Sequence, residues 1–336
     1  MRFTDPVIGG GPRLRVNYIA FDSLGVKSQC VKVATPEVTV CIDPGASVQS
    51  SSFPFPAEER REMLARHLET CRLSAVSSKV LVATHYHLDH LISKRDPQVY
   101  RGKVLFAKAF EDLPPKQRAR AEKLHATIDG LPEEVVICDG RKFKFGRTEV
   151  AFSKPVWHGN ENAEPGTVVM VEVKRGKEKV LVSSDVCGPT EKSTTDLVCA
   201  SKARTVVLDG YPTAHLGRFA SDFDLVRSII NVCRVLAMKE LETLVLDHHL
   251  CRDYRYPAFF KLVYAKAKQL KKEFGTAAEL MDRRTAVLQG YQDYGPTKWK
   301  KWFPLDLDGA RDVLKEAVDS GRTGKAILAD LDRWVA

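Results

Sequence analysis

The chain has 336 residues, of which 44% are hydrophobic and 28% are charged, and its formal net charge is +9. This hydrophobic fraction excludes a disordered chain, and the length is enough to bury a large core. No stretch of about 18 apolar residues occurs, and residues 1–6 lack the charged-then-apolar layout of a signal peptide. The sequence therefore predicts a cytoplasmic protein without a membrane partner.

Strand-like and helix-like segments alternate along the chain, and no internal repeat is found. Strands are expected where β-branched and apolar residues run together, and helices where apolar residues recur at three- or four-residue spacing. This alternation is typical of an α/β fold. In chain order, the sequence predicts a strand at 38–41, a helix at 57–72, strands at 79–83, 149–152 and 179–184, a helix at 221–239, a strand at 243–247, and helices at 256–274 and 308–334.

The eight cysteines show no Cys-x-x-Cys spacing and fall mostly in apolar segments. This distribution favours buried free thiols over a zinc ribbon or a disulfide framework. One or two disulfides are the alternative if the organism is a hyperthermophile, because such organisms form disulfides inside the cell.

The most informative motif is a cluster of histidines directly after the expected strand at 79–83. Residues 84–90 read THYHLDH, which places His85, His87, Asp89 and His90 within six residues. Three histidines and a carboxylate this close together cannot all be buried in an apolar core without partners. Imidazole and carboxylate are ligands of zinc-like cations, and a strand end holds such ligands in place. The motif therefore predicts a metal site.

This motif resembles the signature of the metallo-β-lactamase superfamily, whose fold is a four-layer αββα sandwich of two mixed β-sheets with one or two metals at their edge. The resemblance implies further ligands, each at the end of a later strand. The chain offers candidates at three such places, namely His158, Asp185, and either His248 or His249. Asp43 stands where the superfamily keeps an aspartate that orients a ligand imidazole.

Three further segments are similar to an uncharacterised archaeal family within this superfamily, UPF0282. They are 21–26 (FDSLGV), 184–189 (SDVCGP) and 246–253 (LDHHLCRD). The superfamily resemblance covers roughly residues 14–255. It indicates the fold more closely than the substrate, because no reaction is attached to the UPF0282 family.

The resemblance also implies how seven ligands would be shared between two divalent metal ions. His85, His87 and His158 would hold the first ion, Asp89, His90 and His248 the second, and Asp185 would bridge them. Zinc is expected, with manganese or iron as alternatives, because this ligand mix does not choose strongly among them. Two such ions lower the pKa of bound water and so provide hydroxide at neutral pH.

The last ligand is open between two neighbouring residues. Adjacent side chains of an extended segment point in opposite directions, so only one of His248 and His249 is expected to reach the metal without a bulge. His248 is preferred, and His249 then either donates a proton to the leaving group or pairs with Asp253. Asp209 and Asp247, both at strand ends, either orient a ligand or are ordinary turn residues. The residues expected to carry catalysis are Asp89, Asp185 and His249.

The sequence thus predicts a metal-dependent hydrolase that uses a metal-bound hydroxide at a dinuclear site. The net charge and the basic segment 101–123 favour a phosphodiester substrate, either nucleic acid or nucleotide, because lysine and arginine neutralise phosphate. A small-molecule lactone or thioester hydrolase is the alternative, and a non-catalytic binding protein with a vestigial metal site is the third. Candidate anchors for an anionic group of the substrate are Arg118, Arg120 and Arg252.

Two parts of unequal size are expected. Residues 1–295 would form the hydrolase domain, with a helical insertion at about 108–130, and residues 296–336 a basic, helical C-terminal appendage. Beyond Gly295-Pro296 the composition changes to a run of lysines that includes Trp299 and Trp302. These tryptophans could stack on nucleic-acid bases, but we expect them to pack against the sandwich.

Overall fold

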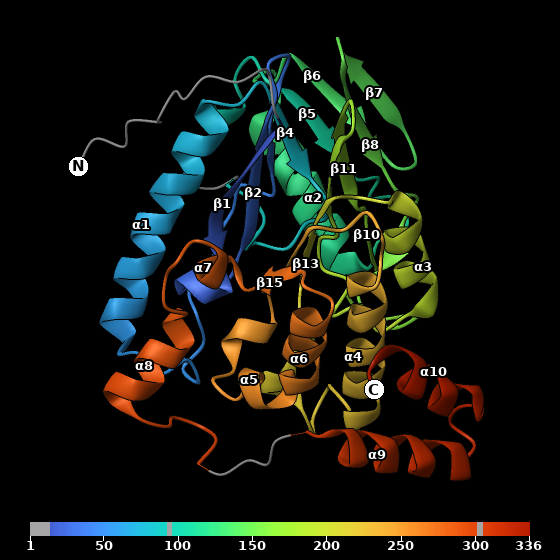
Figure 1. Cartoon of the computed structure of the whole chain (residues 1–336). Helices are drawn as coiled ribbons and strands as arrows, with labels where there is room; N and C mark the ends of the chain where they lie inside the picture. Colours follow the sequence, from blue (N-terminus) through green and yellow to red (C-terminus); the bar gives the residue numbers. More distant parts are fainter. Residues whose placement is uncertain (1–13, 93–95, 301–304) are drawn as a thin grey trace.

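The computed structural model describes residues 14–92, 96–300 and 305–336. In this part of the chain two large β-sheets stand face to face, and helices cover the outer face of each sheet (Figure 1). The layers follow one another as helix, sheet, sheet and helix, which is the αββα sandwich that the sequence predicts. No described helix is both long and apolar enough to span a lipid bilayer.

The first sheet has six strands in the order β1-β2-β3-β4-β5-β6. The strands from β3 to β6 pair in parallel, whereas β1, β2 and β3 pair antiparallel. Two helices cover its outer face, and both connect parallel neighbours, so the helix expected as an insertion is an ordinary crossover between β5 and β6. The elements are β1 (Arg15–Phe21), β2 (Gln29–Ala34), β3 (Thr39–Ile42), α1 (Ala57–Val76), β4 (Val80–Ala83), β5 (Val104–Ala107), α2 (Pro115–Ile128) and β6 (Glu134–Ile137).

The second sheet has seven strands in the order β15-β14-β13-β12-β11-β8-β7. The strands from β12 to β15 pair in parallel, and β11 pairs antiparallel with both of its neighbours. A short antiparallel pair, β9 (Val156–Trp157) and β10 (Thr167–Val168), lies outside both sheets. The strands are β7 (Lys142–Phe145), β8 (Thr148–Phe152), β11 (Val171–Arg175), β12 (Glu178–Val182), β13 (Thr205–Leu208), β14 (Thr243–Leu246) and β15 (Glu273–Gly275).

The strands of both sheets alternate between two buried faces. In β4, Val80 and Val82 belong to the apolar cluster between the sheets, whereas Leu81 belongs to the cluster beneath the helices. In β14 the same alternation places Val245 between the sheets and Leu244 against the helices. Burying each such side chain contributes about 1.5–3 kcal/mol, so both layers of core stabilise the position of the strand ends.

Helix α4 (Asp222–Leu236) lies on the outer face of the second sheet together with α3 (Lys192–Ser201) and α6 (Lys261–Gln269). Its start agrees with the expected cap, because the Ser221 side chain accepts a hydrogen bond from the Asp224 backbone N–H at 3.1 Å. Twelve of its fifteen residues are buried, because α9 (Leu307–Asp319) and α10 (Ala326–Trp334) pack on the side away from the sheet.

Two of the expected helices are divided in the structure. The segment 256–274 forms α5 (Tyr256–Phe259) and α6, and the chain then turns through Lys271, whose φ of 54° is left-handed, into β15. The segment 308–334 is divided into α9 and α10 at Gly321, whose φ is 73°. A left-handed residue ends an α-helix, and the helical spacing of apolar residues on either side does not reveal it. Between β15 and the C-terminal helices lie α7 (Ala277–Leu280) and α8 (Ala286–Tyr294).

The segment before α9 is attached to the sandwich by Trp299. The backbone N–H of Trp299 donates to the Tyr254 hydroxyl at 2.7 Å, and that hydroxyl donates to the Trp299 carbonyl at 2.6 Å. The guanidinium of Arg255 lies 4.1 Å from the centre of the indole ring. Trp299 therefore packs on the sandwich, as expected, while Trp302 lies outside the described residues.

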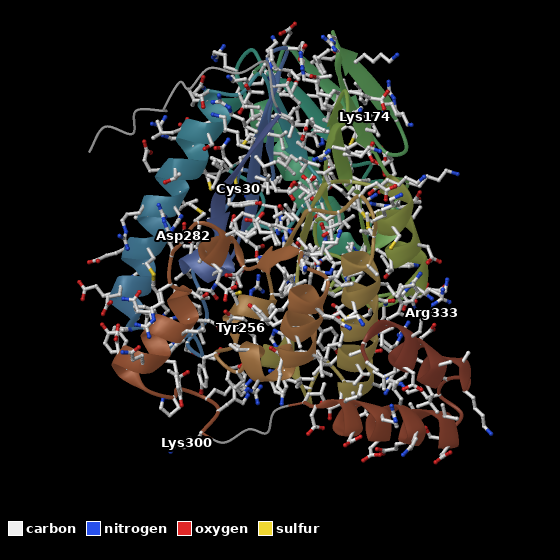
Figure 2. The ribbon with its side chains drawn as sticks, viewed as in Figure 1. Cys30, Lys174, Tyr256, Asp282, Lys300 and Arg333 are labelled. Carbon is white, nitrogen blue, oxygen red and sulfur yellow. The ribbon has the colours of Figure 1, made fainter. Side chains whose placement is uncertain are left out.

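All eight cysteines are free thiols, six of them buried, as the sequence predicts. Cys30 lies on the face of β2 that is turned towards α1 (Figure 2). Its sulfur is 3.9 Å from that of Cys41 on the neighbouring strand. These thiols fill the space between the first sheet and its helices, as small apolar side chains would.

Candidate metal centre

Apart from His158, which follows the antiparallel strand β9, the candidate ligands follow the carboxyl ends of parallel strands. Asp43 comes directly after β3, the motif at 84–90 after β4, Asp185 after β12, Asp209 after β13, and His248 after β14. In a parallel sheet the carboxyl ends of neighbouring strands share one edge, which is where open α/β sheets form their binding sites. Because the two sheets stand face to face, these loops meet at one edge of the sandwich.

Asp185 is the centre of the resulting cluster. Its carboxylate oxygens lie 3.4 Å from His85 Nε2, 3.3 Å from His90 Nε2 and 3.2 Å from His158 Nε2. His87 Nδ1 lies 3.9 Å away, and His248 Nε2 lies 3.6 Å away. Among the described residues the donor atoms form five groups whose members all lie within 4.8 Å of one another, and two of these groups hold the expected ligands: His85, His87, His158 and Asp185, and then Asp89, His90 and His248. His249 belongs to two others, with Asp185 and His248 and with Cys187 and Asp209.

Four atoms at the middle of this cluster are buried and lack a hydrogen-bond partner. They are the Nε2 atoms of His85, His90 and His158 and Oδ1 of Asp185. Leaving a buried polar atom unpaired costs about 1–3 kcal/mol, so four such atoms at one point require a partner that the side chains do not supply. A divalent cation accepts imidazole nitrogen and carboxylate oxygen together. The residues present therefore fit a metal site.

Three of the histidines are oriented by carboxylates on the side away from the cluster. His90 Nδ1 lies 2.9 Å from Asp43 Oδ2, which also accepts a hydrogen bond from the Thr84 hydroxyl at 2.6 Å. His248 Nδ1 is hydrogen-bonded to Asp22. A carboxylate that accepts the Nδ1 proton leaves Nε2 free to face a cation, and metal-binding histidines commonly have such a partner.

The third carboxylate–histidine pair joins His249 to Asp209, with Nδ1 and Oδ2 3.1 Å apart. Asp209 is fully buried and also accepts the backbone N–H groups of Val186 and Cys187 at 3.0 and 2.7 Å. The carboxylate thus fixes the loop that follows Asp185. Asp209 therefore orients a histidine of the cluster, which the sequence left undecided.

The geometry of His249 differs from the expected one. β14 ends at Leu246, and His249 has a φ of 65°, so the chain is not extended at the two histidines. The two rings consequently lie on the same side, with centroids 4.3 Å apart, and His249 Nε2 is 3.8 Å from Asp185. The expected alternation of side chains is therefore wrong here. The suggested pairing with Asp253 is also wrong, because Asp253 accepts from Arg255 instead.

Left-handed backbone is concentrated in this region. Four of the eight described non-glycine residues with positive φ are Asp43, Ser184, Cys187 and His249. Such a conformation costs about 1–3 kcal/mol per residue and persists only where the surrounding structure enforces it. Here it turns each chain sharply at a strand end, so that the side chains converge.

The charges of the cluster suit cation binding. Burial raises the pKa of the Asp185 carboxyl, but His90 and His248 outweigh it and hold this pKa well below its usual range. Burial lowers the pKa of the imidazoles of His85 and His87, which keeps them in the neutral form that binds metal. The centre therefore presents a carboxylate and the neutral imidazoles of His85 and His87 to the same point, while neighbouring carboxylates outweigh burial and raise the pKa of His90 and His248.

Asp22 is a residue of the centre that the sequence reasoning missed, although it lies in the segment 21–26 quoted for the UPF0282 resemblance. Its carboxylate accepts hydrogen bonds from Arg252 Nε at 2.6 Å and Gln49 Nε2 at 2.8 Å, besides its bond with His248. Burial would raise its pKa, but the charges of Arg252 and His248 lower it to about 2. The signal available in the sequence was an aspartate that directly follows a strand.

Asp247 lies away from the cluster. It is fully buried, and its carboxylate accepts the backbone N–H groups of Ser23 at 2.9 Å and Ala277 at 2.8 Å. These bonds join β14 to the start of α7 and to the segment after β1. Of the two alternatives for Asp247, the structure supports the turn-stabilising one.

The three candidate substrate anchors lie in different environments. Arg252 is in the centre, where Nη2 lies 3.5 Å from Asp89 Oδ2 and Nε binds Asp22. Arg118 and Arg120 lie on α2, where Arg118 is exposed and Arg120 half-buried. Within the described chain, neither of them is hydrogen-bonded or ion-paired to a residue of the cluster. The structure thus brings only Arg252 to the candidate centre.

Relatives of this chain were found among archaeal proteins. A UPF0282 protein from Metallosphaera sedula is 34% identical over 300 residues, which cover 85% of this chain and 95% of that protein. A UPF0282 protein from Korarchaeum cryptofilum is 33% identical over 278 residues, which cover 82% of this chain and 92% of that protein. No family model matches the chain.

Solved structures resemble the chain at a lower level. The metallo-beta-lactamase fold protein YhfI from Bacillus subtilis aligns with 74% of this chain and 87% of its own, with 12% identity and a TM-score of 0.43. A possible metal-dependent hydrolase from Veillonella parvula aligns with 79% of this chain and 95% of its own, with 12% identity and a TM-score of 0.46. These similarities concern the fold alone. The chain belongs to the UPF0282 family of archaeal proteins and has the metallo-β-lactamase fold.

Proposed function

We propose that this chain is a metal-dependent hydrolase with a dinuclear site that cleaves phosphodiesters. The observation that carries the proposal is the convergence of unpartnered donor atoms, His85, His90 and His158 Nε2 and Asp185 Oδ1, on one buried point. A vestigial site would not be expected to keep so costly an arrangement, because the donors have no other use in the fold.

The proposed ligands are those of two of the groups of donor atoms, together with the shared Asp185. His85, His87 and His158 would hold one cation, Asp89, His90 and His248 the other, and Asp185 would bridge them. When bound, the two cations would acidify water and supply the nucleophile at neutral pH. Zinc is the first candidate, and manganese and iron fit the same donors.

The residues around the cluster have proposed roles of their own. Asp43, Asp22 and Asp209 hold three imidazoles in one tautomer, so that Nε2 of each faces inwards. His249, at the edge of the cluster, is 12% exposed and is the proposed proton donor to the leaving group. The cationic side chains near Asp89 favour a substrate that is negatively charged, which is why a phosphodiester is preferred to a lactone or thioester.

Metal analysis and hydrolysis assays test this proposal together. The purified protein is expected to contain one to two equivalents of zinc, manganese or iron and to hydrolyse bis-p-nitrophenyl phosphate faster than a panel of lactones and thioesters. Asp185→Asn is expected to remove most of the metal and the activity, because it takes away the shared carboxylate. Asp282→Asn, an equal change at an exposed position, is the control.

Three results would contradict parts of this proposal. If the protein contains less than a tenth of an equivalent of metal after growth with these metals, it is not a metal-dependent hydrolase. If it contains metal but hydrolyses only lactones or thioesters, its substrate is of the alternative class. If it contains metal and hydrolyses none of these esters, it is a binding protein.

A further inference from the structure

A group of cations lies on the side of the cluster formed by Asp89 and His248. We name it the basic wall, and it consists of Lys27, Arg218 and Lys298. The three residues come from three separate segments of the chain, the turn after β1, the segment 211–220 and the segment before α9. None of them belongs to the proposed ligands, and the proposed function uses only their positive charge, not their individual positions.

Lys27 is the member nearest to the centre. It is half-buried and interacts electrostatically with Asp22, Asp89 and Arg252. Among the residues that the structure describes, its ammonium group has no hydrogen-bond or ion-pair partner. Its backbone exchanges two hydrogen bonds of 2.9 Å with Ser47, which fixes its position. A partly buried cation that no carboxylate contacts directly costs free energy, which an incoming anion would offset.

The segment 211–220 brings further cations to the same place. Its short helix η3 (Thr213–His215) packs against η4 (Leu250–Arg252), which directly follows the two histidines. Arg218 follows this helix. The imidazole of His215 lies among the cations, and burial together with the charges of Lys298, Lys27 and Arg218 lowers its pKa, so it adds no charge of its own. Lys298 Nζ donates a hydrogen bond of 3.2 Å to the Ala214 carbonyl, so the segment before α9 contributes to the wall.

The nearby carboxylates do not neutralise the basic wall. Asp22 is hydrogen-bonded to Arg252, Gln49 and His248, and Asp89 lies 3.5 Å from Arg252 and among the proposed ligands. In the described chain, no acidic side chain forms an ion pair with Lys27, Arg218 or Lys298. The three cations together carry more positive charge than one carboxylate balances. They suit a phosphate group, which carries up to two negative charges.

An exposed ring lies next to these charges. Phe219 is 75% exposed, and the guanidinium of Arg218 lies 4.5 Å from the centre of its ring. A large aromatic side chain this exposed is available for stacking, and stacking on a base is worth about 1–3 kcal/mol. Cations and an aromatic face side by side suit a nucleotide better than a simple phosphate ester.

We infer that Lys27, Arg218 and Lys298 bind a second phosphate of a nucleotide substrate, one that is not hydrolysed. The inference rests on the proposed function, because it takes the first phosphate to lie at the metal cluster. The second phosphate belongs either to a small nucleotide or to the next unit of a nucleic-acid strand, and the chemistry that recognises it is the same in both.

Calorimetric titration of the metal-loaded protein tests this inference without requiring turnover. Thymidine 3′,5′-bisphosphate is expected to bind about tenfold more tightly than thymidine 5′-monophosphate, which corresponds to about 1.4 kcal/mol. Lys27→Gln and, separately, Arg218→Gln are expected to reduce this ratio at least fivefold. Lys177→Gln removes the same charge from the exposed turn between β11 and β12 and is expected to leave the ratio unchanged.

The outcomes separate the inference from the proposed function. Equal ratios in the wild type, Lys27→Gln and Arg218→Gln would overturn the inference, even if bis-p-nitrophenyl phosphate is hydrolysed. If the ratio of the two affinities depends on Lys27 but the protein hydrolyses no ester, the hydrolase proposal is overturned and the site is a nucleotide-binding site. A ten-unit oligothymidylate distinguishes a small nucleotide from a nucleic-acid strand. If it binds more tightly than the bisphosphate, and Lys27→Gln removes this difference, the second phosphate belongs to a strand.

Discussion

The carboxyl group of Asp22 connects two functional side chains of the candidate centre. It binds Arg252 through one oxygen and His248 through the other, and all three groups are buried or nearly so. The guanidinium balances the charge of the carboxylate, and the carboxylate fixes the imidazole. The position of His248 Nε2 thus depends on a residue that touches no metal.

Asp22→Asn is expected to weaken binding of the second cation by about 10–100-fold, because the amide orients His248 less strongly than the carboxylate does. Competition with a chromophoric chelator measures this affinity. The same substitution at Asp282, whose side chain is exposed, is the matched control. An unchanged affinity in Asp22→Asn would show that His248 is held by other contacts.

His249→Ala and His248→Ala are expected to have different effects, although both rings face Asp185. His248→Ala should lose metal, because this residue shares a group of donors with the proposed ligands Asp89 and His90, whereas in the described chain His249 shares its groups with Asp185 and His248 and with Cys187 and Asp209. His249→Ala should keep the metal and lose about 10²–10⁴-fold in kcat, as the removal of a general acid does.

Asp209→Asn should reproduce the effect of His249→Ala, because Asp209 holds the His249 ring. Elemental analysis and steady-state kinetics measure the effects, with His125→Ala on α2 as the control. Loss of metal in His249→Ala would instead make His249 a ligand.

At the scale of elements, the loop after β3 supports the loop after β4. A Cβ atom added at Gly45 would lie 2.1 Å from the backbone nitrogen of Leu91 and 2.4 Å from the carbonyl carbon of His90. Both contacts are with main chain, which cannot move without moving His90 itself. Only glycine lets the two strand-end loops approach this closely.

Gly45→Ala is therefore expected to reduce the free energy of unfolding by about 1–3 kcal/mol, as overpacking does, and to weaken metal binding at the same time. Urea unfolding and metal analysis check the two effects. Gly324→Ala is the control, because nothing lies within 4 Å of the Cβ position there and its φ is not positive. If both variants unfold at the same urea concentration, the loops are free to separate.

At the scale of the whole molecule, the C-terminal helices form part of the core. Leu314 of α9 and Leu331 of α10 are fully buried, and both helices contact α4, which also packs against α3 and α6. The proposed division at residue 295 therefore separates two parts that share one apolar cluster. Such a pair is expected to unfold together.

Leu314→Ala should lower the free energy of unfolding by about 2–5 kcal/mol, in a single transition, because it leaves a cavity in the shared core. The amount of metal bound per folded molecule should not change, since no residue of α9 belongs to the described groups of candidate ligands. Leu197→Ala, at a position that is 47% exposed, is the control. A separate early transition in Leu314→Ala would establish the C-terminal helices as an independent appendage.

The sequence by itself determined the strands that carry the centre and the ligands nearest to them. The apolar runs before His85 and Asp185 identify two strands from their own residues. A polar residue that follows such a buried strand then lies at the edge of the sheet. The α/β class followed from the alternation of strands and helices, and the four layers followed from the resemblance of residues 84–90 to the superfamily motif. These features are predictable because each depends on neighbours within a few positions.

The tertiary structure decided which distant groups support those ligands. Asp22 and His248 are 226 positions apart in sequence and meet only because the two sheets pack face to face. The left-handed turn at His249 and the place of Lys27 beside Arg252 depend in the same way on packing between loops. Such contacts leave no periodic pattern in the chain, because they arise between elements and not along them.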